Sequence, residues 1–198
     1  MSYAIIGSGA IGGALAKQFA RSKINTVIAN RRGPASLEDV SEALGSAVSA
    51  AETTQALDAQ VIILAVPFDA VADVAKQRND WSGKIVVDAT NAIEFPAFKP
   101  QDLGGRPSTQ VVATQFKGAK VVKAFNTLPA AVLAEDPRRS EGNRTIFVSG
   151  DHADANEQVA SLASSLGFGA ITLGRLEEGG LLQQFGGPLM VQNLIKQR

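Results

Sequence analysis

Short apolar runs alternate along this chain with segments whose apolar residues recur at the spacing of one helical face. Tyr3–Ile6 is such a run, and Ile11, Leu15 and Phe19 follow it at helical spacing, which predicts a strand, a tight turn and a helix. This unit repeats several times. Further strands are predicted at residues 26–29, 47–49, 61–66, 85–87, 120–124, 145–149 and 170–173, and further helices after Pro34 and at 68–76, 108–116 and 155–166.

The strongest of these strands are continuous aliphatic runs without polar alternation. Such strands are covered on both faces, and their alternation with helices predicts a mostly parallel sheet with right-handed crossovers. Residues 91–107 lose this periodicity and are expected to form a long loop, of a kind that is often functional. Residues 177–198 are leucine-rich, but Gly186, Gly187 and Pro188 interrupt them. We therefore predict an α/β fold with a doubly wound sheet and a short C-terminal helical cap.

The composition removes several classes of function. The 198 residues include 19 basic and 19 acidic side chains, so no net charge draws the protein toward nucleic acid or an anionic membrane. With no cysteine and His152 as the one histidine, neither thiol chemistry nor a metal site is expected. The longest apolar run, residues 61–68, is far shorter than the roughly 20 residues of a membrane helix. A cytoplasmic protein without nucleic-acid or membrane partners is predicted.

Gly7, Gly9 and Gly12 form a GxGxxG motif between the first predicted strand and the first predicted helix, with Ser8, Ala10 and Ile11 between them. The first glycine permits the tight turn, the second leaves room for a pyrophosphate, and the third lets the helix pack on the strand. The phosphates would then meet unpaired N–H groups at the helix N-terminus. This context favours a Rossmann-type dinucleotide site over a glycine-rich turn without a ligand.

The end of the second predicted strand indicates which dinucleotide binds. Folds specific for NAD usually place an acidic residue there, about 20 residues past the glycines, to bind the ribose 2′-hydroxyl. This chain has Asn30, Arg31 and Arg32 instead. Two guanidinium groups suit a 2′-phosphate, because they can make bidentate, charge-assisted hydrogen bonds. NADP(H) is therefore predicted, although a solvated basic turn would have the same sequence.

Residues that follow other predicted strands should lie at the same carboxyl edge of the sheet. Ala65, Val66 and Pro67 follow the fourth strand and Asn91 follows the fifth, so these four are expected to contact the cofactor, partly through their backbone.

Three further polar or aromatic residues have simpler structural explanations. Asp88 fits a turn acceptor better than a catalytic acid, and Asp151 fits the N-cap of the helix after residue 151. Trp81 is expected to be a packing anchor.

Taken together, five segments resemble the NADPH-dependent coenzyme F420 reductase family, also called F420-dependent NADP oxidoreductases. They are residues 7–12, 30–34, 65–67, 123–130 with the sequence KAFNTLPA, and the leucine-rich C-terminal segment, and the likeness runs over nearly the whole chain. The fold is also similar to the cytoplasmic reductase domain of the STEAP metalloreductases, which uses a flavin in place of F420.

The resemblance implies roles for the residues after the sixth strand. Ala124 and Phe125 would face the nicotinamide, and Asn126, Thr127 and Leu128 would line the acceptor pocket. A competing interpretation is that Leu128 starts a packed helix. No catalytic residue is expected, because hydride passing between two stacked rings needs positioning more than acid–base chemistry.

These observations predict two regions: a dinucleotide-binding Rossmann domain at residues 1–125, and a small extension at 126–198 that completes the sheet and the acceptor pocket. The leading hypothesis is an NADPH-dependent oxidoreductase that exchanges hydride with a small-molecule acceptor; F420, FMN and FAD all remain open. A noncatalytic NADP(H)-sensing protein is the alternative, and a small imine or ketone reductase would need a proton donor that does not stand out. The resemblance and the apolar C-terminal segment point to a homodimer.

Overall fold

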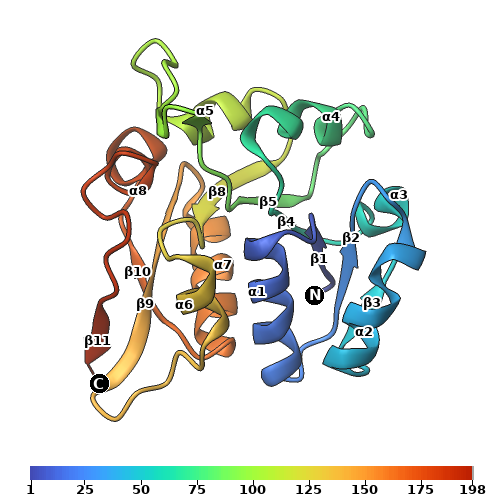
Figure 1. Cartoon of the computed structure of the whole chain (residues 1–198). Helices are drawn as coiled ribbons and strands as arrows, with labels where there is room; N and C mark the ends of the chain where they lie inside the picture. The colour runs from blue at the N-terminus through green and yellow to red at the C-terminus, as the bar shows by residue number, and fades with distance from the viewer. Residues whose placement is uncertain (198) are drawn as a thin grey trace.

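Strands and helices alternate through most of the computed structural model, which describes residues 1–197 (Figure 1). The strands are β1 (Tyr3–Ile6), β2 (Thr26–Ala29), β3 (Val48–Ala50), β4 (Val61–Leu64), β5 (Ile85–Asp88), β6 (Ile93–Glu94), β7 (Lys99–Pro100), β8 (Lys120–Ala124), β9 (Gly142–Gly150), β10 (Gly169–Thr172) and β11 (Ile195–Gln197). The α-helices are α1 (Ala10–Arg21), α2 (Glu38–Leu44), α3 (Thr53–Ala56), α4 (Val71–Ala75), α5 (Ser108–Ala113), α6 (Ala130–Ala134), α7 (Ala153–Ser165) and α8 (Leu181–Gln183). Short 3₁₀ helices cover Pro34–Leu37 and Phe68–Ala70, and a π-helix covers Leu176–Gly180.

A nine-stranded sheet forms the centre of the molecule. Eight strands follow the order β10-β9-β8-β5-β4-β1-β2-β3, and the ninth, β11, pairs with β9 but is not part of this order. Neighbours from β3 to β8 are parallel, and so are β9 and β10. Strand β9 runs antiparallel to β8, and β11 runs antiparallel to β9. The mostly parallel, doubly wound sheet predicted from the sequence is therefore confirmed.

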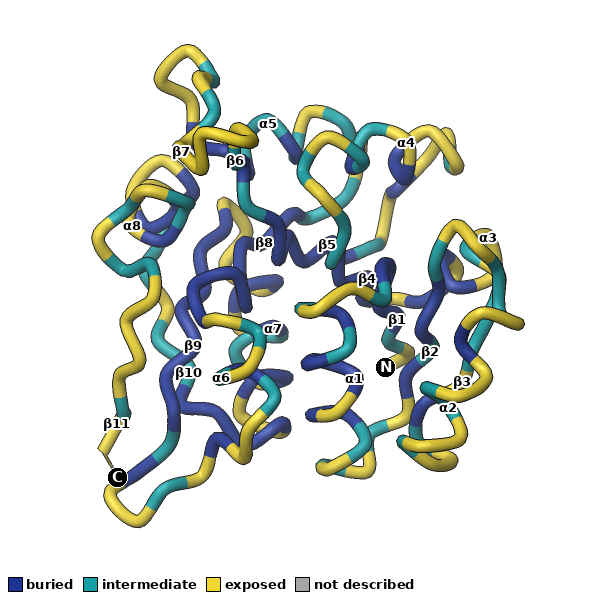
Figure 2. The backbone as a smooth tube through the Cα atoms, viewed as in Figure 1, coloured by how far each residue is buried: buried dark blue, intermediate teal, exposed yellow. Residues whose placement is uncertain are grey.

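The two faces of the sheet bury separate hydrophobic clusters. Successive side chains of β1 point to opposite faces, so Ile5 joins the cluster beneath α1 and α7, whereas Ala4 and Ile6 join the cluster beneath α3, α4 and α5. Figure 2 shows the result as dark blue strands enclosed by helices that are exposed on their outer sides. Trp81 is the predicted packing anchor: it is 1% exposed and meets the Phe116 ring edge-on.

The last third of the chain differs from the prediction in its details. Residues 126–197 share the sheet and the larger core cluster with the preceding part, because β9 pairs with β8, and Val159 of α7 belongs to the same cluster as Leu15 of α1. The C-terminal cap contains one π-helical turn and the short α8, and the chain then turns extended and ends in β11. Helix α8 ends at Gln183 because the backbone of Gln184 is extended, and Gly186, with a φ of +86°, and Pro188 lie beyond that end.

Strand pairing explains two other differences. Strand β9 begins at Gly142, three residues before the predicted start, because β11 pairs with Gly142–Arg144. The predicted loop at 91–107 contains a small hairpin, in which β6 pairs with β7 and Lys99 Nζ lies 3.4 Å from Glu94 Oε2. Within residues 1–197, no helix combines the length and the apolar character that a membrane crossing requires.

Candidate functional site

A cavity of about 500 Å³ lies at the carboxyl edge of β1, β2 and β4, beside the N-terminus of α1. Its walls include most of the residues predicted to bind the cofactor: Gly7, Ser8, Gly9, Asn30, Arg31, Arg32, Ala65, Val66 and Pro67. The other predicted residues, Ala10, Ile11, Gly12, Asn91, Ala124 and Phe125, do not line it.

The three motif glycines have the surroundings that a dinucleotide turn requires. Gly7 has a φ of +110°, and a Cβ there would lie 2.2 Å from the carbonyl oxygen of Ala65. A Cβ on Gly12 would lie 1.9 Å from the carbonyl oxygen of Gly7, so the helix packs here directly on the turn. A Cβ on Gly9 would meet nothing within 4 Å. The open space therefore lies over the middle glycine, where the motif places the pyrophosphate.

The N-terminus of α1 is available to an anion. Gly9 is the N-cap residue, and no side chain caps the helix. The first N–H groups of an α-helix have no partners within the helix and carry the positive end of its dipole. Twelve residues of helix thus begin at an uncapped N-terminus beside the cavity, an arrangement suited to phosphate binding.

Asn30 links two turns in the cavity wall. Its amide nitrogen donates to Ser8 Oγ at 2.9 Å and to Ser36 Oγ at 3.0 Å, and its Oδ1 accepts from the backbone N–H of Arg32 at 2.8 Å. The glycine turn and the arginine turn are therefore joined by one side chain. Arg31 and Arg32 are exposed, and in the part of the chain that is described neither forms a salt bridge. Two guanidinium groups consequently stand unneutralised at the cavity wall.

Sequence reasoning missed six wall residues: Ile6, Thr53, Ala70, Asp73, Val74 and Gln77. Thr53 follows β3, as the predicted residues follow their strands, and its hydroxyl donates to the carbonyl oxygen of Asn30 at 3.3 Å. The rule that strand ends share one edge could have found it. Ala70, Val74 and Gln77 recur at helical spacing along α4 and its ends; a helix was predicted over 68–76, but none of its residues was assigned to the site.

Asn91 and Asn126 form a reciprocal pair where β5 and β8 end. The Asn91 amide donates to the Asn126 carbonyl oxygen, and the Asn126 amide donates to Asn91 Oδ1, each at 3.0 Å. The same Asn126 nitrogen also donates to the carbonyl oxygen of Gln183 at 2.6 Å. This pair ties the loop after β5 to the C-terminal segment.

The side chains predicted to face the nicotinamide and the acceptor lie elsewhere. Phe125 is 1% exposed, and its backbone has a φ of +63°, which turns the ring into the core against Phe168. Leu128 is 2% exposed and belongs to the main core cluster. Asn126 and Thr127 are also buried, and the Thr127 carbonyl accepts from the N–H of Val191. The observed packing corresponds to the competing interpretation, in which Leu128 precedes the packed helix α6.

Asp88 has the structural role expected of it. Its side chain and that of Lys123 are both 0% exposed and form an ion pair at 3.2 Å. Thr109 Oγ1 donates to Asp88 Oδ2 at 2.5 Å, and Thr90 donates to Asp88 Oδ1 from both its N–H and its hydroxyl. The carboxylate therefore fastens β5, β8 and α5 together.

The prediction that Asp151 caps α7 is wrong by one residue. His152 occupies the N-cap position, and the Asp151 carboxylate instead accepts from the N–H of Leu176 at 3.1 Å. Within residues 1–197, no cluster of three or more His, Asp or Glu side chains is arranged to hold a metal ion.

Known proteins resemble this chain in sequence and structure. A hypothetical protein from Sinorhizobium meliloti is 59% identical, with a TM-score of 0.97 over 99% of this chain and 96% of its own. A putative F420-dependent NADP reductase from Arthrobacter sp. FB24 is 26% identical, with a TM-score of 0.73 over 89% of this chain and 86% of its own.

A curated relative extends the comparison to longer proteins. The metalloreductase STEAP3 of Rattus norvegicus is 28% identical over 172 residues, which are 87% of this chain. The chain spans about a third of the length of the curated relatives it matches.

The family model for the coenzyme F420-dependent NADP oxidoreductases matches residues 2–92. This segment runs from β1 to the end of β5 and carries the glycine turn, the arginine turn and the Ala65–Pro67 wall. By this match, residues 2–92 belong to the F420-dependent NADP oxidoreductase family, and over most of its length the chain is similar to a putative member of that family and to STEAP3.

Proposed function

We propose that this protein binds NADP(H) in the cavity over Gly9 and exchanges hydride between NADPH and a flavin or deazaflavin acceptor. The observation that carries the proposal is the combination of open space over Gly9 with two unneutralised guanidinium groups in the wall of the same cavity. A pyrophosphate and a 2′-phosphate are the two anionic parts of NADP(H), and the cavity offers a positive environment to each.

The chain's residues fit the nucleotide in three respects. The uncapped α1 N-terminus would receive the pyrophosphate, and Arg31 and Arg32 would receive the 2′-phosphate. Asn30 would hold both turns at a constant separation through its hydrogen bonds to Ser8 and Arg32. A cavity of about 500 Å³ also lies within the usual range for small-molecule sites.

The wall chemistry favours transfer between two rings over reduction of a carbonyl or imine. Among the wall residues described, Asp73 is the acidic member and there is no histidine. Asp73 is highly exposed and lies 3.2 Å from Lys76 Nζ. Bound NADPH would supply a hydride to the acceptor ring. The protein would align the two rings and exclude water, and these two effects determine the rate of hydride transfer between rings.

The test is an anaerobic panel in which the protein is mixed with NADPH or NADH and with FMN, FAD or F420. We expect oxidation of NADPH with at least one acceptor and weak or no oxidation of NADH. Calorimetry run in parallel measures nucleotide binding separately. Binding of NADPH without oxidation would favour the alternative of a noncatalytic NADP(H)-sensing protein, and equal affinities for NADPH and NADH would contradict the assignment of the arginines.

A further inference from the structure

The hydroxyl group of Ser8 has a hydrogen that no described protein group accepts. Ser8 lines the cavity over Gly9 and is partly exposed. Its Oγ accepts from the amide nitrogen of Asn30 at 2.9 Å, and within residues 1–197 it donates to no acceptor. A serine hydroxyl can accept and donate at the same time. The Ser8 hydrogen is therefore left for a group that enters the cavity.

The direction of this hydrogen bond follows from the orientation of the Asn30 amide. The backbone N–H of Arg32 can only donate, and it lies 2.8 Å from Asn30 Oδ1. The amide oxygen must therefore face Arg32, and this orientation turns the amide nitrogen toward Ser8. With the opposite orientation, Ser8 would have to donate to Asn30 Oδ1 and would have no hydrogen left for a ligand.

Ser36 holds the other side of the same amide. It lies in the 3₁₀ helix Pro34–Leu37, directly after the arginine turn, and its Oγ accepts from the Asn30 nitrogen at 3.0 Å. The Ser36 hydroxyl has its nearest acceptor in the carbonyl oxygen of Gly33 at 2.8 Å, whereas Asn30 Oδ1 is farther away at 3.2 Å. Both hydrogens of the Asn30 amide thus have acceptors, Ser8 on one side and Ser36 on the other. Hydrogen bonds joined in series orient and polarise one another.

We propose that Ser36 is a positioning residue for the 2′-phosphate of NADP(H), although Ser36 does not line the cavity. The inference rests on the proposed function and adds a residue that determines cofactor specificity from outside the wall. Ser36 fixes the plane of the Asn30 amide, Asn30 donates to Ser8, and Ser8 donates its free hydrogen to an oxygen of the 2′-phosphate. The 2′-phosphate is the partner because Asn30 joins Ser8 to the arginine turn.

The experiment compares two probes that differ in the 2′-phosphate alone. Adenosine 2′,5′-bisphosphate and adenosine 5′-monophosphate share the base, the ribose and the 5′-phosphate. Calorimetry measures the binding of each to the full chain. Ser8→Ala is expected to weaken the bisphosphate about tenfold and to leave the monophosphate unchanged, because a hydrogen bond to a charged group is lost.

Ser36→Ala is expected to weaken the bisphosphate about threefold, since it removes one exposed hydrogen bond that acts on the phosphate only through Asn30. Ser36→Thr retains the hydroxyl and should retain the wild-type affinity. The monophosphate should bind equally well to all three proteins.

The double variant Ser8→Ala/Ser36→Ala distinguishes a positioning role from a structural one. If Ser36 acts through Ser8, its loss has no further effect once the Ser8 hydroxyl is gone. The double variant should then bind the bisphosphate as well as Ser8→Ala does. A further threefold loss would show that Ser36 only stabilises the arginine turn.

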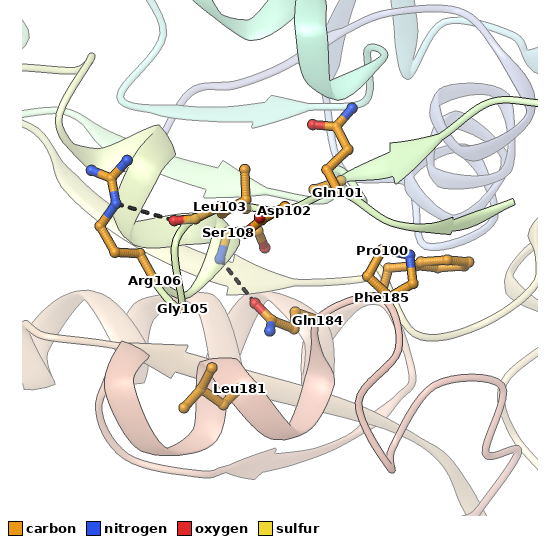
Figure 3. Close-up of a pocket in the computed structure, with 11 residues that line it drawn as sticks. Pro100, Gln101, Asp102, Leu103, Gly105, Arg106, Ser108, Leu181, Gln184 and Phe185 are labelled. Atoms are coloured by element: carbon orange, nitrogen blue, oxygen red, sulfur yellow. Dashed lines mark hydrogen bonds between the residues drawn. The ribbon is translucent and has the colours of Figure 1, made fainter. Parts of the chain in front are cut away.

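A second cavity provides a serine for comparison. It has a volume of about 320 Å³, lies between the 100–108 segment and the region around α8 (Figure 3), and shares no wall residue with the cavity over Gly9. Ser108 is part of its wall, and Figure 3 shows the bond from the Ser108 N–H to Gln184 Oε1, which is 2.9 Å long. Ser108→Ala therefore removes a hydroxyl from a cavity wall without touching Asn30.

Ser41 is a control for the local backbone. Its Oγ donates at 2.9 Å to the carbonyl oxygen of Glu38, three residues earlier, as Ser36 donates to Gly33, but Ser41 lies outside the cavity over Gly9. Ser41→Ala and Ser108→Ala should both leave the two affinities unchanged.

The outcomes separate this inference from the proposed function. Unchanged bisphosphate affinity in Ser36→Ala, or an equal effect of Ser36→Ala with and without the Ser8 hydroxyl, overturns the positioning role even if NADPH binds and is oxidised. Equal loss of both probes in Ser8→Ala would assign Ser8 to the 5′-phosphate and would also overturn it. A wild-type protein that does not prefer the bisphosphate contradicts the proposed function itself.

Discussion

The three motif glycines differ in what surrounds them, and so they differ in what a side chain would do. At Gly7 and Gly12 a Cβ would collide with backbone atoms, whereas at Gly9 it would enter empty space. Substitution at the outer two positions therefore acts on folding. Substitution at the middle position is expected to affect ligand binding and to leave folding unchanged.

Gly9→Val is expected to abolish NADPH binding and to leave the protein folded. The branched side chain meets no protein atom but fills the space required by the pyrophosphate. Calorimetry with NADPH and a thermal melt check the two halves of this prediction. Gly13→Ala is the matched control, because Gly13 also has open space and lies within α1 outside the cavity wall. Unimpaired NADPH binding by Gly9→Val would mean that the motif is only a turn.

Arg31→Ala is expected to weaken NADPH about tenfold while leaving NADH unaffected. A hydrogen bond to a charged group contributes roughly 1.5–3 kcal/mol, and only NADPH carries the 2′-phosphate. Affinities for both nucleotides, measured by calorimetry, give the comparison. Arg175→Ala, an exposed arginine outside the cavity, should change neither. An equal loss of affinity for NADPH and NADH would indicate that Arg31 stabilises the turn and does not bind the 2′-phosphate.

At the scale of elements, the segment from β8 to α6 is a structural connection, although its residues resemble a ligand site in sequence. Phe125 and Leu128 point into the core, and the Thr127 carbonyl binds the C-terminal segment through Val191. Gln183 adds a hydrogen bond from its amide to the Lys123 carbonyl at 2.8 Å. The C-terminal segment is thereby attached to the end of β8 and to the residues that follow it.

Leu128→Ala is accordingly expected to destabilise the protein by about 2–5 kcal/mol, the usual cost of truncating a buried leucine. Urea unfolding measures the loss. Hydride transfer in the fraction that remains folded should keep its wild-type rate, as measured by single-turnover kinetics. A variant of normal stability with slower transfer would return Leu128 to the acceptor site.

At the scale of the whole molecule, the sheet is one unit that joins the family-matched residues 2–92 to the remainder through β5 and β8. The buried Asp88–Lys123 ion pair crosses this junction, and Thr109 of α5 is bonded to the same carboxylate. Burying two charges is costly, so the pair stabilises the junction only while both members are present.

Lys123→Met is expected to cost about 3 kcal/mol or more, because it leaves a buried carboxylate without its cation. Adding Asp88→Asn should restore part of the loss by removing the charge. Urea unfolding of the two single variants and the double variant gives the coupling energy as a double-mutant cycle. Simple additivity of the two changes would show that the two side chains do not depend on each other.

Much of the fold followed from local sequence. The strand boundaries at Tyr3–Ile6, Thr26–Ala29 and Lys120–Ala124 were predicted to the residue, because buried parallel strands are continuous apolar runs ended by turn residues. The glycine and arginine turns were placed correctly because each directly follows one of these strands. The hairpin at 93–100 was missed because each of its strands is only two residues long, and the strand β11 was missed because its partner β9 is distant in sequence.

By itself, the sequence of this protein determined the order of its eight longer strands, the mostly parallel sheet, and the glycine and arginine turns that line the cavity over Gly9. These features rest on periodicity and on glycine geometry, which act between near neighbours. Only the tertiary structure decided that Phe125 and Leu128 face the core and that the 100–108 segment meets Phe185 across a second cavity. The direction of an apolar side chain after a strand depends on which distant surface it can be buried against, and that surface forms only when the chain has folded.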